Sequence, residues 1–236
     1  MYKYNLITMK RTDFYFCLIV VALFAPFVLS PNLYAGYQSF NAEHGMVMSF
    51  LKFAVLSTLG ELLGLRISTG QYLRKGFGVL PRAVVWGVLG MGINLAFIVF
   101  STGVPAAAGY LGVDDPAAIM AGPVTLSKVL LAFAISVSLN SIFAPVFMTF
   151  HKITDTHILA TGGTLRGLFT PIPMGDIMQN LNWRVQWGFV FKKTIPFFWF
   201  PAHTITFLLP GEMRVLFAAL LGVALGVILA VAARKK

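Results

Sequence analysis

The chain has 236 residues, of which 58% are hydrophobic and 11% are charged, against about 45–50% and about 25% in soluble domains. This balance excludes a water-soluble globular protein, because so much apolar surface cannot be hidden inside one. The formal net charge of +10 does not indicate nucleic-acid binding, since the basic residues form no aromatic-interleaved stripe and stand between lipid-like blocks.

The apolar residues fall into blocks close to the length of about 20 residues that a helix needs to cross the hydrocarbon core. The predicted fold class is therefore all-α, a polytopic transmembrane helix bundle that forms one domain over residues 1–236. The first and fifth blocks are short and contain Pro26 and Pro201, which predict kinks that neighbouring helices tolerate. The six predicted spans are 14–30, 46–65, 83–101, 129–150, 195–209 and 215–233.

The first block follows the basic residues Lys3, Lys10 and Arg11, an arrangement that also describes a cleavable signal peptide. No small-x-small cleavage site follows residues 14–30, so we predict a retained helix. The start of the chain also lacks the amphipathic, arginine-rich run of an organellar transit peptide. We therefore favour the cytoplasmic membrane of a bacterium over an organellar membrane.

The basic residues fall on one side of the predicted membrane. Fifteen of the 18 lysines and arginines lie in the start of the chain, in 66–82, in 151–194 and in 234–236, which an even number of spans places on one face. The connections on the other face contain only Arg214, together with four acidic residues. Since lysine and arginine are retained on the cytoplasmic side, we predict six spans with both termini cytoplasmic.

The long connection 151–194 combines irregular and apolar sequence. Residues 161–174 are rich in Gly, Thr and Pro and predict irregular chain. The following stretch, 177–191, mixes Trp183 and Trp187 with basic and apolar residues, which is typical of a helix in the membrane interface. Continuation of this helix into the fifth span is an equal alternative.

Four of the polar residues within the predicted spans are the strongest candidates for a functional lining, since ionisable groups at such places usually face a bundle interior or an aqueous cavity. Glu61 is the clearest, and Asn94, Asn140 and His203 follow in later spans. The functional interpretation is the lining of a pore or substrate cavity. The alternative is interhelical hydrogen bonding, worth about 0.6–2 kcal/mol per contact. For His203 the alternatives are a proton acceptor and a neutral, hydrogen-bonded imidazole.

The sequence contains no nucleophile elbow, no Walker loop and no two-histidine zinc motif. His151 and His157 are six residues apart, so a helix would not present both on one face as metal ligands. The single cysteine, Cys17, is expected to be a small hydrophobic residue in the first span. We expect no enzyme activity, no catalytic residue, no cofactor and no metal site.

The C-terminal part resembles the family of the mitochondrial MPV-seventeen protein and the twenty-two-kilodalton peroxisomal membrane protein. That family has a Trp-Pro with a following Gln, then Asn-Phe, and then a Pro four residues before an Arg. Here the pattern contains Pro210 and Arg214, with His203 and Thr206 where Gln and Asn are usual. The matching residues are Trp199, Pro201, Phe207, Pro210, Arg214, Val215, Leu216 and Phe217.

Weaker similarities extend the resemblance over residues 46–233. Asn140 and Pro145 resemble the family's Asp-Gln followed by Ala-Pro, and Gly60 with Glu61 resembles its Gly-Asp. Arg82 keeps the family's spacing to two glycines, although a His and a Trp-Tyr after them are missing. The resemblance implies a membrane protein proposed to act as a channel, and it raises the functional weight of Glu61. Family members are described with four spans rather than six.

Our first functional hypothesis is a small channel or permease-like protein for small solutes or ions, lined by Glu61, Asn94, Asn140 and His203. The second is a non-catalytic scaffold or accessory subunit that binds a partner protein or anionic lipid through 151–194. The expected partners are the lipid bilayer and a small solute or ion, with a homo-oligomer as an open alternative and no nucleic acid.

Overall fold

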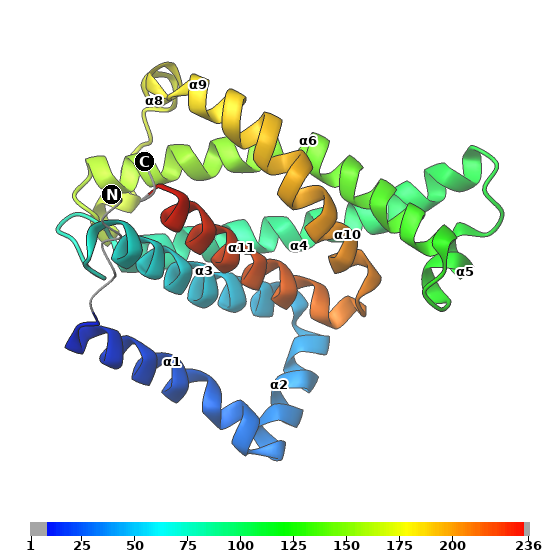
Figure 1. Cartoon of the computed structure of the whole chain (residues 1–236), viewed down its shortest axis with the longest axis horizontal. Coiled ribbons are helices and arrows are strands. Elements are labelled where there is room, and N and C mark those ends of the chain that lie inside the picture. Colours follow the sequence, from blue (N-terminus) through cyan, green and yellow to red (C-terminus); the bar gives the residue numbers. More distant parts are fainter. Residues whose placement is uncertain (1–8, 234–236) are drawn as a thin grey trace, which may run out of the picture.

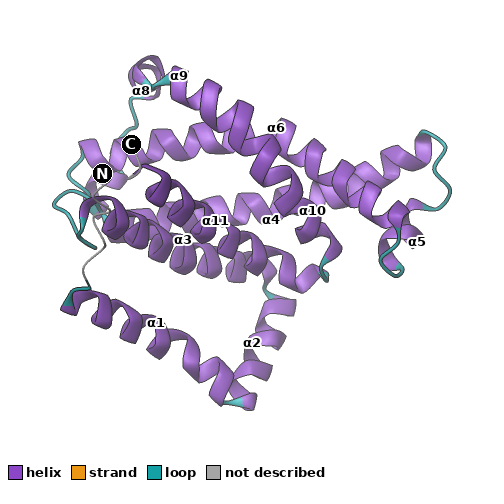
Figure 2. Ribbon diagram, viewed as in Figure 1, coloured by secondary structure: helices purple, strands orange, loops and turns teal. Residues whose placement is uncertain are grey.

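The computed structural model describes residues 9–233, and these form helices joined by short connections, with no strand among them (Figures 1 and 2). The predicted all-α polytopic bundle is confirmed. The helices are α1 (Arg11–Leu29), α2 (Pro31–Glu43), α3 (Gly45–Thr69), α4 (Val79–Tyr110), α5 (Pro116–Ala121), α6 (Leu126–Ala160), α7 (Leu165–Leu168), α8 (Met174–Asn180), α9 (Trp183–Val185), the π-helix η1 (Gln186–Trp199), α10 (Phe200–Leu208) and α11 (Gly211–Ala233).

Five helices are long and apolar enough to cross a membrane, namely α1, α3, α4, α6 and α11. The chain is therefore a multi-pass membrane protein. The predicted fifth span, 195–209, is not one of them, because the helical run from Trp183 to Leu208 is divided into α9, η1 and α10, none of which reaches about 20 residues. The run is nevertheless continuous and lies antiparallel to α6 (Figure 1). Residues 183–191 of the predicted stretch 177–191 continue into the fifth span, whereas 177–180 belong to the separate helix α8.

The successive long segments alternate in direction (Figure 1). The start of α1, the end of α11 and the connections 70–78 and 161–182 lie at one end of the bundle, which we call the basic end. The alternating direction of the segments therefore places the basic start of the chain and the basic connections at one end, as the charge pattern predicted. Lys3, Arg234, Lys235 and Lys236, which entered the topology prediction, lie outside the described residues.

Helices α4 and α6 exceed their predicted spans. They have 32 and 35 residues, and at about 1.5 Å per residue each measures about 50 Å, more than a hydrocarbon core of about 30 Å. They project together beyond the bundle at the end opposite the basic end, where α5 connects them (Figure 1). The connection between the third and fourth spans is thus largely helical.

The core lies where α3 packs against α4 and α11, and α6 against α4 and α10. Small residues allow the close approach: a Cβ on Gly90 of α4 would stand 2.5 Å from the Cβ of Phe53 in α3. Gly60 of α3 similarly faces the backbone of Val223 in α11. The buried apolar cluster contains Phe53, Leu56, Ala96, Phe97, Ala132, Ile135, Leu139, Phe207, Val215, Ala218 and Ala219.

Helix α1 contacts this core through the partly buried Phe24 and has no fully buried residue. Its first turns are held at the basic end, where Arg66 Nη2 lies 2.6 Å from Asp13 Oδ2. The rings of Phe16 and Tyr72 stack there at 4.5 Å. Most other apolar side chains of α1 are exposed, as expected of a helix that faces lipid.

Candidate functional site

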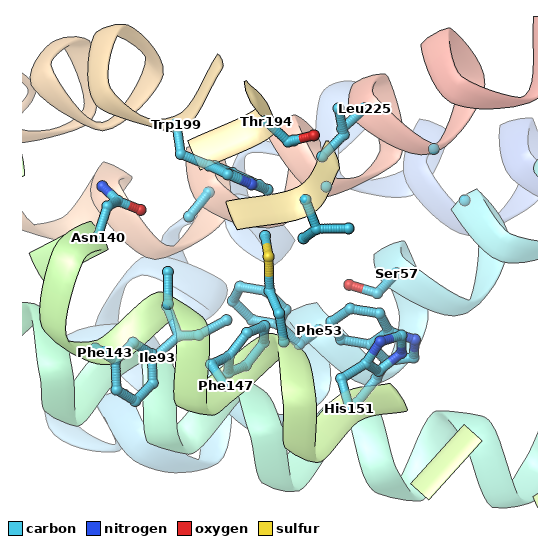
Figure 3. Close-up of a pocket in the computed structure, with 18 of the residues that line it drawn as sticks. Phe53, Ser57, Ile93, Asn140, Phe143, Phe147, His151, Thr194, Trp199 and Leu225 are labelled. Atoms are coloured by element: carbon cyan, nitrogen blue, oxygen red, sulfur yellow. The ribbon is translucent and has the colours of Figure 1, made fainter. Parts of the chain in front are cut away.

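A partly open cavity of about 360 Å³ lies between α3, α4, α6, η1, α10 and α11. This volume lies within the range of small-molecule sites, about 300–1,000 Å³. Its walls are mainly aromatic and aliphatic (Figure 3). The aromatic residues are Phe53, Trp86, Phe97, Phe143, Phe147 and Trp199.

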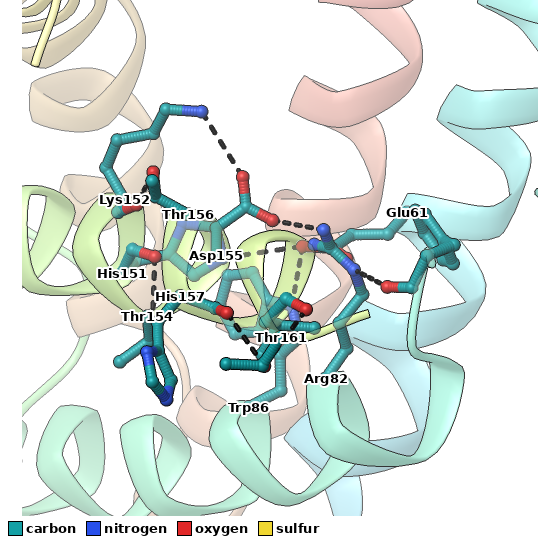
Figure 4. A network of polar contacts seen from close by, with 12 residues as sticks. Glu61, Arg82, Trp86, His151, Lys152, Thr154, Asp155, Thr156, His157 and Thr161 are labelled. Atoms are coloured by element: carbon teal, nitrogen blue, oxygen red, sulfur yellow. Dashed lines mark hydrogen bonds and ion pairs between the residues drawn. The ribbon is translucent and has the colours of Figure 1, made fainter. Parts of the chain in front are cut away.

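A charged network at the basic end joins three helices and borders the cavity through Glu61 and Lys152 (Figure 4). Arg82 of α4 donates from Nη1 to Glu61 Oε2 of α3 at 2.6 Å, and its Nη2 pairs with Asp155 Oδ1 of α6. Lys152 Nζ lies 3.2 Å from Asp155 Oδ2. Two acidic and two basic groups therefore balance one another, and the buried Arg82 has both carboxylates as partners, as a charge removed from water requires.

The second oxygen of Glu61 is also occupied. Trp86 donates from Nε1 to Glu61 Oε1 at 2.9 Å, and His151 Nε2 lies 3.4 Å from the same oxygen. The rings of Trp86 and His151 pack at 4.4 Å between centroids. Glu61 borders the cavity, but its carboxylate is already satisfied by α4 and α6.

An uncharged network lies elsewhere on the cavity wall. Ser136 donates to the carbonyl of Phe200 at 2.8 Å, and Asn140 Nδ2 donates to the carbonyl of Ser136 at 2.8 Å. Asn140 Oδ1 lies 3.1 Å from His203 Nδ1. Because the Asn140 nitrogen is used within α6, its oxygen accepts from His203, which assigns the ring hydrogen to Nδ1. In the neutral ring, Nε2 is then an acceptor.

Three buried polar atoms on the cavity wall have no hydrogen-bond partner among the described residues. They are Ser57 Oγ, Gln186 Nε2 and Trp199 Nε1. Ser57 is 5% exposed and Gln186 is 8% exposed, and Figure 3 shows Ser57 and Trp199 at the cavity. Such groups are rare, because an unsatisfied buried donor costs about 1–3 kcal/mol. They are the groups on this wall that a bound molecule could satisfy.

Three of the four residues predicted to line a cavity, Glu61, Asn140 and His203, border this one. Asn94 does not. Its Nδ2 faces the start of α3, 3.4 Å from the Gly45 carbonyl and 3.5 Å from Met46 Sδ. For Asn94, the alternative hypothesis of an interhelical hydrogen bond therefore agrees better with the structure.

The residues singled out by the family resemblance have structural surroundings of several kinds. Gly60 borders the cavity and Arg82 centres the charged network. Pro145 lies inside α6, and Pro210 precedes α11. Arg214 donates to the carbonyls of Leu209 and Phe207, at 3.0 and 3.3 Å, and so caps the end of α10.

Sequence reasoning missed Ser57, Gln186 and Trp199 as a set, because nothing in their spacing connects them. For the charged network a signal existed. Arg82 and Trp86 are four residues apart, as are His151 and Asp155, and residues at that spacing share a helix face. His157 is not part of this network; its Nε2 contacts the Gly167 carbonyl at 3.0 Å.

The described residues contain no group of three His, Cys, Asp or Glu arranged to hold a metal ion. No family model, no curated protein and no solved structure matches the chain.

Proposed function

We propose that the chain is a small permease-like protein that takes a small, uncharged solute into the bundle cavity. The observation that carries the proposal is the unpartnered set Ser57, Gln186 and Trp199 on the wall of a cavity inside a membrane protein. A cavity that served packing alone would favour apolar atoms or satisfied polar ones at these places. The solute would supply the missing acceptors.

An uncharged solute fits better than an ion. The charged residues that border the cavity gather at the basic end and neutralise one another. The remaining wall is mainly aliphatic and aromatic, and it offers no ring of carbonyls or charges to replace the hydration shell of an ion. Transfer of an unpaired ion into such surroundings is costly.

The resemblance to the MPV-seventeen family supports the same proposal, because that family is proposed to form channels. Glu61 and Arg82 occupy the family's acidic and basic places, and here they pair across α3 and α4. We further propose that the basic end faces the cytoplasm of a bacterium, in accordance with the retention of lysine and arginine on that side.

Cysteine labelling tests whether the cavity is open to water-soluble reagents. In a Cys17→Ser background, Ser57→Cys is compared with Ser49→Cys, a second buried serine of α3 that does not border the cavity. We expect a methanethiosulfonate reagent to modify Ser57→Cys at least about tenfold faster. Equal slow labelling of both positions would contradict an accessible cavity.

The same two variants test passage. Reconstituted vesicles are placed in a gradient of an uncharged solute such as glycerol, and swelling is followed before and after labelling. We expect the reagent attached to Ser57→Cys to slow swelling and the Ser49→Cys vesicles to be unchanged. Swelling no faster than that of protein-free vesicles would refute a permease.

One observation favours the scaffold alternative. Trp183 and Trp187 are exposed, and Lys192 Nζ lies 5.9 Å from the centroid of the Trp187 ring. Exposed indoles beside a basic residue suit binding to a headgroup surface. A partner captured only when Trp187 is intact, combined with vesicles that show no flux, would support this function.

A further inference from the structure

The unpartnered groups on the cavity wall are biased toward donation. The indole Nε1 of Trp199 and the amide Nε2 of Gln186 can only donate, whereas the hydroxyl of Ser57 can donate or accept. Hydrogen-bond acceptors are therefore what a ligand must bring. A carbonyl oxygen meets this need without adding a new donor that would itself require a partner.

The donors are not placed to share one ligand atom. Gln186 is the first residue of η1 and Trp199 is the last. Gln186 thus stands one helix length away from the uncharged network, whereas Trp199 belongs beside it: its ring lies 4.9 Å from that of His203. The cavity accordingly has two donor positions separated along η1.

The aromatic side chains of the same cavity wall favour a flat ring. Phe97 meets His203 edge-on at 5.5 Å, and Phe143 and Phe147 lie 5.5 Å apart on α6. Aromatic side chains prefer stacked or edge-to-face contacts with other rings. The charged network adds no net charge that would demand a counter-charge on the ligand.

We infer that the solute is a planar, uncharged ring compound that carries carbonyl oxygens, of the quinone or aromatic ketone class. The inference rests on the proposed function, since it names the substrate class of the same cavity. A carbonyl would accept from Trp199 Nε1 or from Gln186 Nε2, and the ring would pack against the aromatic wall.

Paired probes test the inference. The full chain in detergent, with Cys17→Ser, is dialysed against 2,3-dimethyl-1,4-naphthoquinone or 2,3-dimethylnaphthalene, and binding is corrected with protein-free micelles. The two probes share a ring system, and only the first has acceptor oxygens. We expect the quinone to bind about threefold to tenfold more tightly, the effect of about one hydrogen bond.

Substitutions test whether the preference for the quinone over the hydrocarbon depends on Trp199 Nε1 and Gln186 Nε2. Trp199→Phe keeps an aromatic ring and deletes the indole donor. Gln186→Leu replaces the amide with an apolar side chain of similar size. The double variant is expected to bind both probes equally, at the affinity of the hydrocarbon. The matched control is Trp187→Phe, an exposed tryptophan on the same π-helix, and it should keep the preference.

The outcomes separate this inference from the proposed function. Equal binding of both probes by the unsubstituted chain overturns the inference and leaves a binding cavity. Absence of binding together with fast labelling of Ser57→Cys also overturns it, while the permease proposal survives. If Ser57→Cys is not labelled and neither probe binds, both proposals are wrong.

Discussion

The cavity has two kinds of polar border, and they differ in whether their hydrogen-bonding capacity is used. At the basic end, Glu61, Arg82 and Asp155 join three helices, and the carboxylate of Glu61 is fully occupied. Along η1, Gln186 and Trp199 present buried donors without partners.

The difference teaches that charge is a poor guide to the ligand site of this bundle. Buried charges must be paired to be tolerated, so they are used up in holding helices together. Neutral donors cost less when left open. The neutral donors of Gln186 and Trp199 can therefore stay free for a ligand at a smaller loss of stability than an unpaired charge would cause. Three substitutions test this difference.

The largest effect is expected for Arg82→Met. The substitution removes a buried guanidinium and leaves the partly buried carboxylates of Glu61 and Asp155 without their shared cation. We expect a cost of about 3 kcal/mol, the lower end of the range for breaking a buried ion pair. The free energy of unfolding, measured by denaturation in mixed micelles, should fall by about that amount.

Arg74→Met is the control for Arg82→Met. Arg74 is exposed in the connection between α3 and α4, and exposed substitutions usually change stability by no more than about 0.5 kcal/mol. Equal losses in the two variants would mean that the charged network does not hold the basic end together.

A smaller effect is expected for Gly90→Ala in the helix pair that carries Phe53 to the cavity wall. The added Cβ would meet the Cβ of Phe53 at 2.5 Å, so α3 and α4 must separate at a cost of about 1–3 kcal/mol. Gly92→Ala is the matched control, because nothing lies within 4 Å of its added Cβ. Thermal unfolding should show a lower midpoint for Gly90→Ala alone.

Much of the fold could be predicted from the sequence, because hydropathy and basic residues report directly on bilayer physics. The all-α bundle followed from the apolar blocks, and the shared end of 70–78 and 161–182 followed from their charges. The ends of α4 and α6 did not. Thr102 and Lys152 are polar residues that follow the predicted spans directly, so the sequence predicted connections there, whereas α4 and α6 continue as helices to Tyr110 and Ala160.

The candidate site was harder to predict, because its members meet only in three dimensions. Glu61, Asn140 and His203 were found because polar residues in apolar blocks are conspicuous. Gln186 was not predicted, because it lies in the stretch 177–191, whose mixture of tryptophans and basic residues is typical of a helix in the membrane interface.

The smallest effect on stability, and the sharpest test of the contrast, is expected for Gln186→Leu. The substitution removes a buried donor that has no partner among the described residues, so no hydrogen bond is lost. Replacement of an unsatisfied polar group by an apolar one of similar shape is neutral or stabilising, and the free energy of unfolding should change by less than about 0.5 kcal/mol or rise.

Asn140→Leu supplies the comparison for Gln186→Leu within the same cavity wall. Asn140 bonds to Ser136 and to His203, so its loss leaves those groups unsatisfied and should cost about 1–2 kcal/mol, in the range of interhelical hydrogen bonds in membranes. If Gln186→Leu destabilised the chain as much as Asn140→Leu, Gln186 would have a structural partner, and its donor would no longer be free for a ligand. Stability retained in Gln186→Leu, together with loss of the quinone preference, would assign that donor to binding alone.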